Sequence, residues 1–141
     1  MKIKKAIVAT RFLDFLSKIQ GFRVGGFAFF PWIFINRPMP TTKVAKKIWK
    51  KTVNHESIHW YQNVELLWVG FLLLYGLNYI VNLFIYKNHY EAYRNVVFER
   101  EAYENAWKLN YLPETRRWHS YLLYFGKRYE YKSPEKRTGA W

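Results

Sequence analysis

The feature that most constrains the fold is an uncharged apolar stretch at residues 66–86, LLWVGFLLLYGLNYIVNLFIY. About 20 residues of this kind are enough to cross the ~30 Å hydrocarbon core of a bilayer as one helix. A single crossing would leave the two flanking parts of the chain on opposite sides of a membrane. A stretch that turns back would keep them on the same side, where they could build one site together.

Composition narrows the class of protein. The chain has 141 residues, of which 50% are hydrophobic, too many for a disordered chain and enough for one domain. We expect this domain to cover residues 1–131, with a flexible tail at residues 132–141. The formal charge of +13 indicates an anionic neighbour, such as a phospholipid surface, a nucleic acid or an acidic substrate. Because the chain has no cysteine, disulfides, thiol nucleophiles and thiolate metal sites are excluded.

The N-terminus, MKIKKAIVATRFLDF, begins with basic residues, but its uninterrupted apolar run is only AIVA. A secretory signal needs a longer apolar segment. We therefore expect a cytoplasmic protein without a signal peptide. The apolar stretch leaves open a peripheral or hairpin-inserted contact with the membrane.

The remaining pattern predicts a mixed fold. Apolar residues at helical spacing predict a first helix that ends at Gly21. The segment VGGFAFFPWIFIN is rich in aromatic and β-branched residues and predicts one or two strands. A long helix follows, with Thr41 or Thr42 as its N-cap, and further helices are expected over residues 90–110 and after Pro113. The fold class is therefore α+β, mainly helical with a short β-sheet.

The stretch VNHESIHWYQ carries a His-Glu-x-x-His motif, with His55, Glu56 and His59. Residues four apart lie on adjacent turns of one helix face, so both imidazoles can bind one metal ion. Glu56 falls at the edge of a neighbouring apolar stripe, beside Trp49, and an unpaired buried carboxylate is costly. Two interpretations stay open. Glu56 is a general base beside a metal, or the histidines belong to the core and Glu56 pairs with a lysine.

A catalytic zinc takes three protein ligands and keeps a fourth position for water. Downstream, the segment FEREAYENAW offers Glu99, Glu101 and Glu104. On a helix Glu99 shares a face with small and apolar residues, which suits packing against another helix, whereas Glu101 and Glu104 point the other way. We therefore predict Glu99 as the third ligand and expect Glu101 and Glu104 to be solvated charges.

His-Glu-x-x-His followed by Glu-x-x-Ala resembles the gluzincin class of zinc metallopeptidases. The resemblance implies a zincin-like fold and zinc bound by His55, His59 and Glu99. It also implies Glu56 as the general base and a peptide or protein as the substrate. In that class an aspartate often stands four residues after the glutamate and orients the first histidine. This chain has Tyr103 at that position.

Three residues are candidates for an outer shell that donates or accepts hydrogen bonds to the metal ligands: Tyr103, Gln62 and His119. The longer pattern NHESIHWYQNVELL…FEREAYENA is also similar to a family of small uncharacterised bacterial proteins. That similarity covers about residues 24–125 and implies no particular substrate.

The zinc site and a single membrane span exclude each other, because shared coordination requires His59 and Glu99 within a few ångströms of each other. The apolar stretch contains YGLN at residues 75–78, which has turn chemistry, and Gly76 is a candidate helix stop. We therefore expect an apolar helical hairpin over residues 64–88 that joins the active-site helix to the glutamate helix. Whether this hairpin contacts a membrane stays open.

Two other functions remain open. The first is a basic, non-enzymatic membrane-associated protein anchored by residues 66–86, and the second is a zinc-binding, degenerate zincin without turnover. Nucleic acid is not favoured as a partner, because the aromatic residues follow helix and strand faces and no recognised nucleic-acid motif occurs. A lysine-rich segment is compatible with an anionic membrane surface and equally with a solvated helix face: Lys43, Lys46, Lys47, Lys50 and Lys51.

Overall fold

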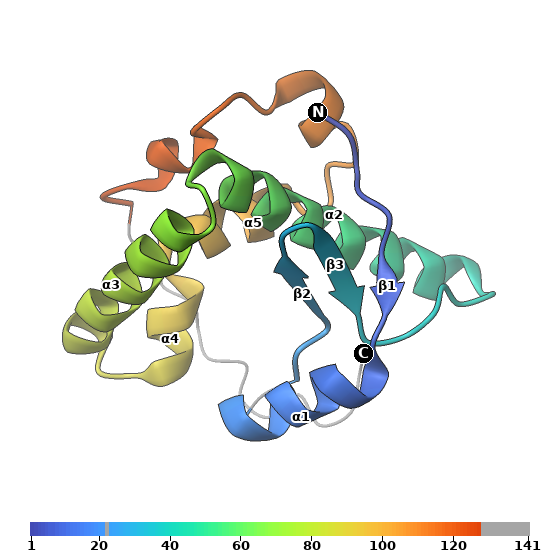
Figure 1. Cartoon of the computed structure of the whole chain (residues 1–141), viewed down its shortest axis with the longest axis horizontal. Coiled ribbons are helices and arrows are strands. Elements are labelled where there is room, and N and C mark those ends of the chain that lie inside the picture. Colours follow the sequence, from blue (N-terminus) through green and yellow to red (C-terminus); the bar gives the residue numbers. More distant parts are fainter. Residues whose placement is uncertain (22, 128–141) are drawn as a thin grey trace.

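The computed structural model describes residues 1–21 and 23–127, so the tail expected at residues 132–141 lies outside the described residues. Within the described chain the fold is α+β and mainly helical, with a small three-stranded sheet, as predicted (Figure 1). In chain order the elements are β1 (Ile7–Val8), α1 (Thr10–Gln20), β2 (Gly26–Phe29), β3 (Trp32–Ile35), α2 (Lys43–Glu65), α3 (Val69–Tyr86), α4 (His89–Arg94), α5 (Val97–Asn105), a π-helical turn η1 (Tyr111–Thr115) and a 3₁₀ helix η2 (Ser120–Tyr124).

The sheet has the strand order β1–β3–β2. The predicted strand segment forms an antiparallel hairpin of β2 and β3, in which Gly26 pairs with Ile35, and β1 adds to β3 in parallel. Strand residues alternate between the two faces of a sheet, so one face of the hairpin can pack on α2. That contact buries a small cluster of side chains: Ala28, Ile33, Ile35 and Val53.

Helix α2 is the central element of the fold. It packs against β2 and β3 and also against α5, which lies behind it in the view of Figure 1. Thr42 is its N-cap, where the hydroxyl accepts a hydrogen bond from the Ala45 N–H at 3.4 Å. The helix before the sheet also ends as predicted, because Gly21 adopts the left-handed conformation (φ 73°) that terminates α1.

Most of the apolar stretch forms one continuous helix, α3, so the expected apolar hairpin over residues 64–88, with its turn at residues 75–78, is wrong. Gly76 keeps a helical conformation. Glycine within a helix costs only about 1 kcal/mol relative to alanine, too little to stop a strongly apolar helix. By length and composition α3 is able to cross a membrane, and only 11% of that segment is buried within the molecule.

The chain turns back after α3 instead of within it. Lys87 ends α3 in the left-handed conformation (φ 53°), and the Asn88 side chain caps α4 by accepting a hydrogen bond from the Glu91 N–H. The chain that follows α2 therefore forms a helical hairpin, in which α3 is one side and α4 with α5 is the other. The hydrogen bonds that connect the two sides include Asn82 Nδ2 to Ala92 O (3.1 Å), Val97 N–H to Asn78 Oδ1 (2.8 Å) and Tyr75 OH to Glu99 Oε1 (2.9 Å).

The helix expected over residues 90–110 is divided into α4 and α5. At the break Val96 is extended (φ −58°, ψ 130°), and the Asn95 amide donates to the Glu91 carbonyl at 2.9 Å. Asparagine side chains often compete with the helix in this way. The N–H of Val97, the first residue of α5, donates to Asn78 on α3. A tertiary contact with α3 thus helps to determine where α5 begins.

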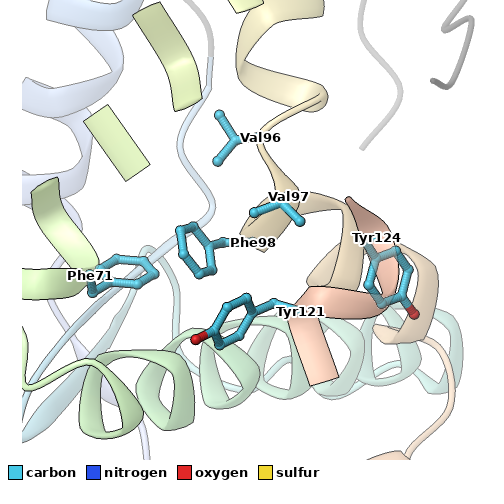
Figure 2. Packing of buried hydrophobic residues seen from close by; sticks show 6 residues of the cluster. All are labelled: Phe71, Val96, Val97, Phe98, Tyr121 and Tyr124. Atoms are coloured by element: carbon cyan, nitrogen blue, oxygen red, sulfur yellow. The ribbon is translucent and has the colours of Figure 1, made fainter. Parts of the chain in front are cut away.

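Two further clusters hold the helices together. The first lies between α2, α5 and η1 and includes Ile58 and Ala102. The second lies among α3, α5 and η2, and Figure 2 shows its central contact, with Phe98 between Phe71 and Tyr121. The ring centroids of these neighbours are 4.9 Å apart in both pairs. The clusters fix α5 beside α2 and α3, which brings Glu99 to the His-Glu-x-x-His motif.

Candidate metal centre

Three ligating side chains converge between α2 and α5. His55 and His59 extend from adjacent turns of α2, and Glu99 extends from the first turn of α5. Glu99 Oε2 lies 3.4 Å from His55 Nε2, and Glu99 Oε1 lies 3.3 Å from His59 Nε2. The two Nε2 atoms are 3.2 Å apart. The structure thus brings together the three residues predicted as ligands, with their ligating atoms within 4.8 Å of one another.

All three side chains are buried, so their charges depend on one another. Burial lowers the pKa of His55 to about 4 in spite of its contact with Glu99. Burial also opposes a charge on His59, but the Glu99 carboxylate outweighs this effect and raises the pKa of His59 to about 9. Burial opposes ionisation of Glu99 as well, yet the facing His59 holds the pKa of this carboxyl well below its usual range. Without a metal, the cluster therefore combines one carboxylate, one protonated histidine and one neutral histidine.

The geometry of the cluster fits a divalent transition metal. In a tetrahedral zinc site with ligands at about 2.0–2.1 Å, neighbouring ligand atoms lie about 3.3 Å from each other. The three closest separations in this cluster are 3.2, 3.3 and 3.4 Å. The buried Oε2 of Glu99 also lacks a well-formed hydrogen bond among the described residues, which is costly for a carboxylate. The group His55, His59 and Glu99 could therefore hold a metal ion.

Gln62, one of the predicted outer-shell residues, contacts His59 directly. Its Oε1 accepts a hydrogen bond from His59 Nδ1 at 2.7 Å, which leaves Nε2 directed at Glu99. Its amide nitrogen donates to the Phe98 carbonyl at 3.1 Å and to Glu101 Oε2 at 2.8 Å. Such a bond on the far nitrogen fixes the tautomer and the orientation of a ligating histidine.

The expectation that Glu101 is a solvated charge is wrong. Its side chain is fully buried, and its Oε1 accepts hydrogen bonds from Tyr111 OH at 3.0 Å and from Arg116 Nε at 2.6 Å. Arg116 also pairs with Glu65 at 2.5 Å. Residue spacing within α5 could not reveal this environment, because Tyr111 and Arg116 both come from the chain beyond α5.

Two tyrosines surround His55 and Glu99. The ring of Tyr103, the second predicted outer-shell residue, packs on His55 with its centroid 4.5 Å away. Tyr75 on α3 donates its hydroxyl hydrogen to Glu99 Oε1 at 2.9 Å. Tyr75 was not among the predicted site residues. The signal for it is its position three residues before Asn78, on the polar stripe of an otherwise apolar helix.

Glu56 lies beside the cluster, buried against strand β2. Burial raises the pKa of Glu56 to about 8. A methyl group built on Gly26 would stand 2.7 Å from Glu56 Cγ and 2.8 Å from Oε1, so only a glycine leaves room for this side chain. Gly26 is a second residue missed at the sequence level. The signal for it is a glycine inside a strand pattern, which often marks a close approach to the backbone.

The structure does not bring His119, the third predicted outer-shell residue, to the ligands. Its ring is half-exposed, and its Nδ1 lies 3.0 Å from the Tyr121 hydroxyl. Its backbone N–H donates to Glu65 Oε2 at 3.0 Å. His119 therefore stands at the far end of the polar network that contains Glu65, Arg116 and Glu101.

No protein-family model, curated protein or solved structure matches this chain. The interpretation of the site therefore depends on its own geometry and chemistry. These consist of a buried group of three potential ligands, the carboxyl group of Glu56 next to it, and the hydrogen bond from the second histidine to Gln62.

Proposed function

We propose that this chain is a zinc-dependent metallopeptidase of the gluzincin type with a zincin-like fold. The observation that carries the proposal is the convergence of His55, His59 and Glu99 at separations that suit one zinc ion, with Glu56 beside them. The order along the chain supports it, because a His-Glu-x-x-His helix precedes a second helix with Glu-x-x-Ala.

A zinc ion held by His55, His59 and Glu99 would polarise the carbonyl of the scissile peptide bond and lower the pKa of an attacking water. Glu56 accepts the proton that the water loses and passes it to the leaving amine. The Nε2 atoms of His55 and His59 face Glu99 and would bind the ion, and Gln62 accepts a hydrogen bond from the Nδ1–H of His59. Burial of these groups keeps bulk water away, so the interaction between Glu56 and the reacting atoms is weakly screened.

A zinc-binding domain without turnover is the second candidate. The specific observation in its favour is the deep burial of all three ligands and of Glu56. Both candidates require the same metal centre and differ only in the hydrolysis of a substrate. Metal binding and hydrolysis therefore need separate measurements.

The first experiment measures metal content. The wild-type chain, purified without added metal, should contain about one zinc ion per molecule. Glu99→Gln removes a ligand and should lower that content several-fold. The matched control is Glu104→Gln on the same helix, where the side chain is exposed as expected and the zinc content should not change. A wild-type chain that neither contains zinc nor binds it on titration would overturn both candidates.

The second experiment separates them. Glu56→Gln should retain the zinc and lose hydrolysis of a mixed peptide library, by roughly 10²–10⁴-fold for the loss of a general base. The readouts are metal content by elemental analysis and cleavage products by mass spectrometry. Zinc-loaded wild-type protein that cleaves no peptide would support the second candidate. Unchanged hydrolysis by Glu56→Gln would exclude Glu56 as the base.

A further inference from the structure

Helix α3 has an inverted distribution of polarity. Its outward side chains are all aliphatic or aromatic hydrocarbons, and they are strongly exposed: Leu72, Leu73, Leu74, Leu77, Ile80, Val81, Phe84 and Ile85. Phe84 is 79% exposed and Leu77 is 61% exposed. A helix on the surface of a water-soluble domain has the opposite arrangement, with its polar residues toward water. The medium outside α3 is therefore not expected to be bulk water.

The polar side chains of α3 point inward and are engaged with α4 and α5. Asn78 and Asn82 bond to the backbone of the returning chain, and Tyr75 bonds to Glu99. Tyr79 OH makes a short hydrogen bond with His89 Nδ1. Polar residues that face the protein interior while hydrocarbon side chains face outward are typical of helices in contact with lipid.

The width of the exposed face indicates what covers it. At about 100° per residue, the outward residues from Leu72 to Ile85 span an arc of about 220° around the helix axis. A partner helix needs an apolar stripe only a little wider than about 100°. One packed helix, from a second copy or from another protein, would leave about half of the arc in water. A fluid hydrocarbon layer covers the whole arc without needing a complementary shape.

We propose that α3 lies in the plane of an anionic phospholipid bilayer, with its outward face among the acyl chains of one leaflet. The two ends of the helix suit the headgroup level, because Trp68 precedes it and exposed Lys87 follows it. Tryptophan and lysine are both favoured at that level. The formal net charge of +13 supplies the attraction to anionic lipid. This proposal goes beyond the metal centre and does not depend on it.

An in-plane position agrees with the hairpin, whereas a perpendicular one does not. The 18 residues of α3 rise about 27 Å, close to the full thickness of the hydrocarbon core. If α3 stood upright, α4 would be carried into that core, because Asn82 binds the Ala92 carbonyl. Helix α4 contains Glu91 and Arg94, and burying charged side chains in the hydrocarbon core costs free energy. In the plane of the surface, α4 and α5 stay on the aqueous side of α3.

The chain has no cysteine, so a single introduced cysteine can be labelled at one known position. We choose Leu77→Cys, labelled with an environment-sensitive fluorophore, and mix the full-length protein with vesicles of phosphatidylcholine containing phosphatidylglycerol. Val44→Cys is the matched control, because Val44 is 74% exposed and the start of α2 lies at the far end of the molecule from α3 (Figure 1). The label at residue 77 should shift to shorter wavelength and be quenched by spin-labelled acyl chains. The label at residue 44 should not be quenched.

A second pair of variants tests the orientation. Leu67→Cys and Lys87→Cys lie at the two ends of α3, where Leu67 is 84% exposed. In the plane of the surface, both thiols should react with a membrane-impermeant maleimide added outside the vesicles. A protected Lys87→Cys thiol beside a reactive Leu67→Cys thiol would show a span and overturn the proposal.

Three further outcomes would also overturn it. The first is an unchanged emission from residue 77 at any vesicle concentration. The second is equal binding to vesicles without anionic lipid, which would remove the role of the charge. The third is a dimer in lipid-free solution that already protects residue 77, since a second copy would then be the occupant. Metal content enters none of these readouts, so the outcome does not depend on the proposed peptidase function.

Discussion

The Gln62 amide holds the Nδ1 side of the His59 ring through a hydrogen bond. Gln62→Leu keeps the approximate size of the side chain and removes its hydrogen bonds to His59 and Glu101. We expect zinc affinity to fall by about 10–100-fold, the usual cost of losing such an outer-shell partner. Competition with a fluorescent chelator measures it. Tyr111→Phe is the control, because it removes another hydrogen bond to Glu101 without touching His59, so it should lower stability and leave zinc affinity unchanged.

Gly26, the first residue of β2, and Gly25, directly before it, form a matched pair. Gly26→Ala would place a methyl group 2.7 Å from Glu56 Cγ, whereas the new methyl group in Gly25→Ala would meet only Thr52 Cγ2, at 3.7 Å. Displacing a packed side chain in this way costs about 1–3 kcal/mol. We expect Gly26→Ala to unfold at a lower urea concentration and to lose hydrolysis, while Gly25→Ala resembles the wild type in both. Equal behaviour of the two variants would contradict the close contact of Glu56 with β2.

The positions of the three candidate ligands are predictable from the sequence because they depend on spacing within single helices. His55 and His59 share a face at four residues apart, and Glu99 lies on the small-residue face of its own helix. The burial of Glu101 and the contact of Tyr75 with Glu99 depend on partners from other elements. No periodicity within one helix contains that information.

At the scale of elements, the buried Asn54 side chain connects α2 with the C-terminal end of α5. Asn54 Nδ2 donates to three carbonyls at and beyond the C-terminal end of α5, those of Asn105 (3.1 Å), Ala106 (3.0 Å) and Lys108 (3.2 Å). The last carbonyls of a helix have no partner inside the helix, so an external donor satisfies them. Asn54 thus helps to keep the glutamate helix in register with the motif helix.

Asn54→Ala should therefore destabilise the protein by about 1–3 kcal/mol, because the buried Ala106 carbonyl loses the donor that Asn54 supplies, whereas the Asn105 and Lys108 carbonyls keep a backbone N–H. Urea unfolding followed by circular dichroism measures the change in free energy. Asn110→Ala is a suitable control, since its amide bonds to Glu114 at an exposed position and its loss should cost little. A cost for Asn54→Ala no larger than that of the control would show that the other contacts between α2 and α5, those of Gln62 and of the apolar cluster, hold α5 in place.

The sequence also predicts most elements but misplaces the turn of the apolar hairpin. Gly76 has the chemistry of a turn, yet it lies within α3, and the chain reverses at Lys87 and Asn88. Glycine permits a turn without requiring one, and continuous helical hydrogen bonds are favoured in an apolar environment. The hydrogen bonds from Asn78 and Asn82 to the returning chain then align α4 and α5 with α3.

At the scale of the whole molecule, the proposed metal centre would link parts of the chain that α3 separates. His55 and His59 precede α3, and Glu99 follows it. The part of the chain before α3 contributes two of the candidate ligands and the part after it contributes the third. The complete set therefore forms only when α4 and α5 pack back against α3. A metal ion that binds the folded chain but not the unfolded chain stabilises the folded state by mass action.

Removal of the metal should therefore destabilise the whole domain. With free zinc at about 100 times the dissociation constant, the gain is about 2.7 kcal/mol, and a chelator should abolish it. Differential scanning calorimetry should show a single transition that moves several degrees lower in EDTA for the wild type. Glu99→Gln should unfold at the same temperature with and without EDTA, and the exposed-site control Glu104→Gln should behave like the wild type. A wild-type transition unmoved by EDTA would mean that no metal ties the two halves together, even though their ligands lie within 4.8 Å of one another.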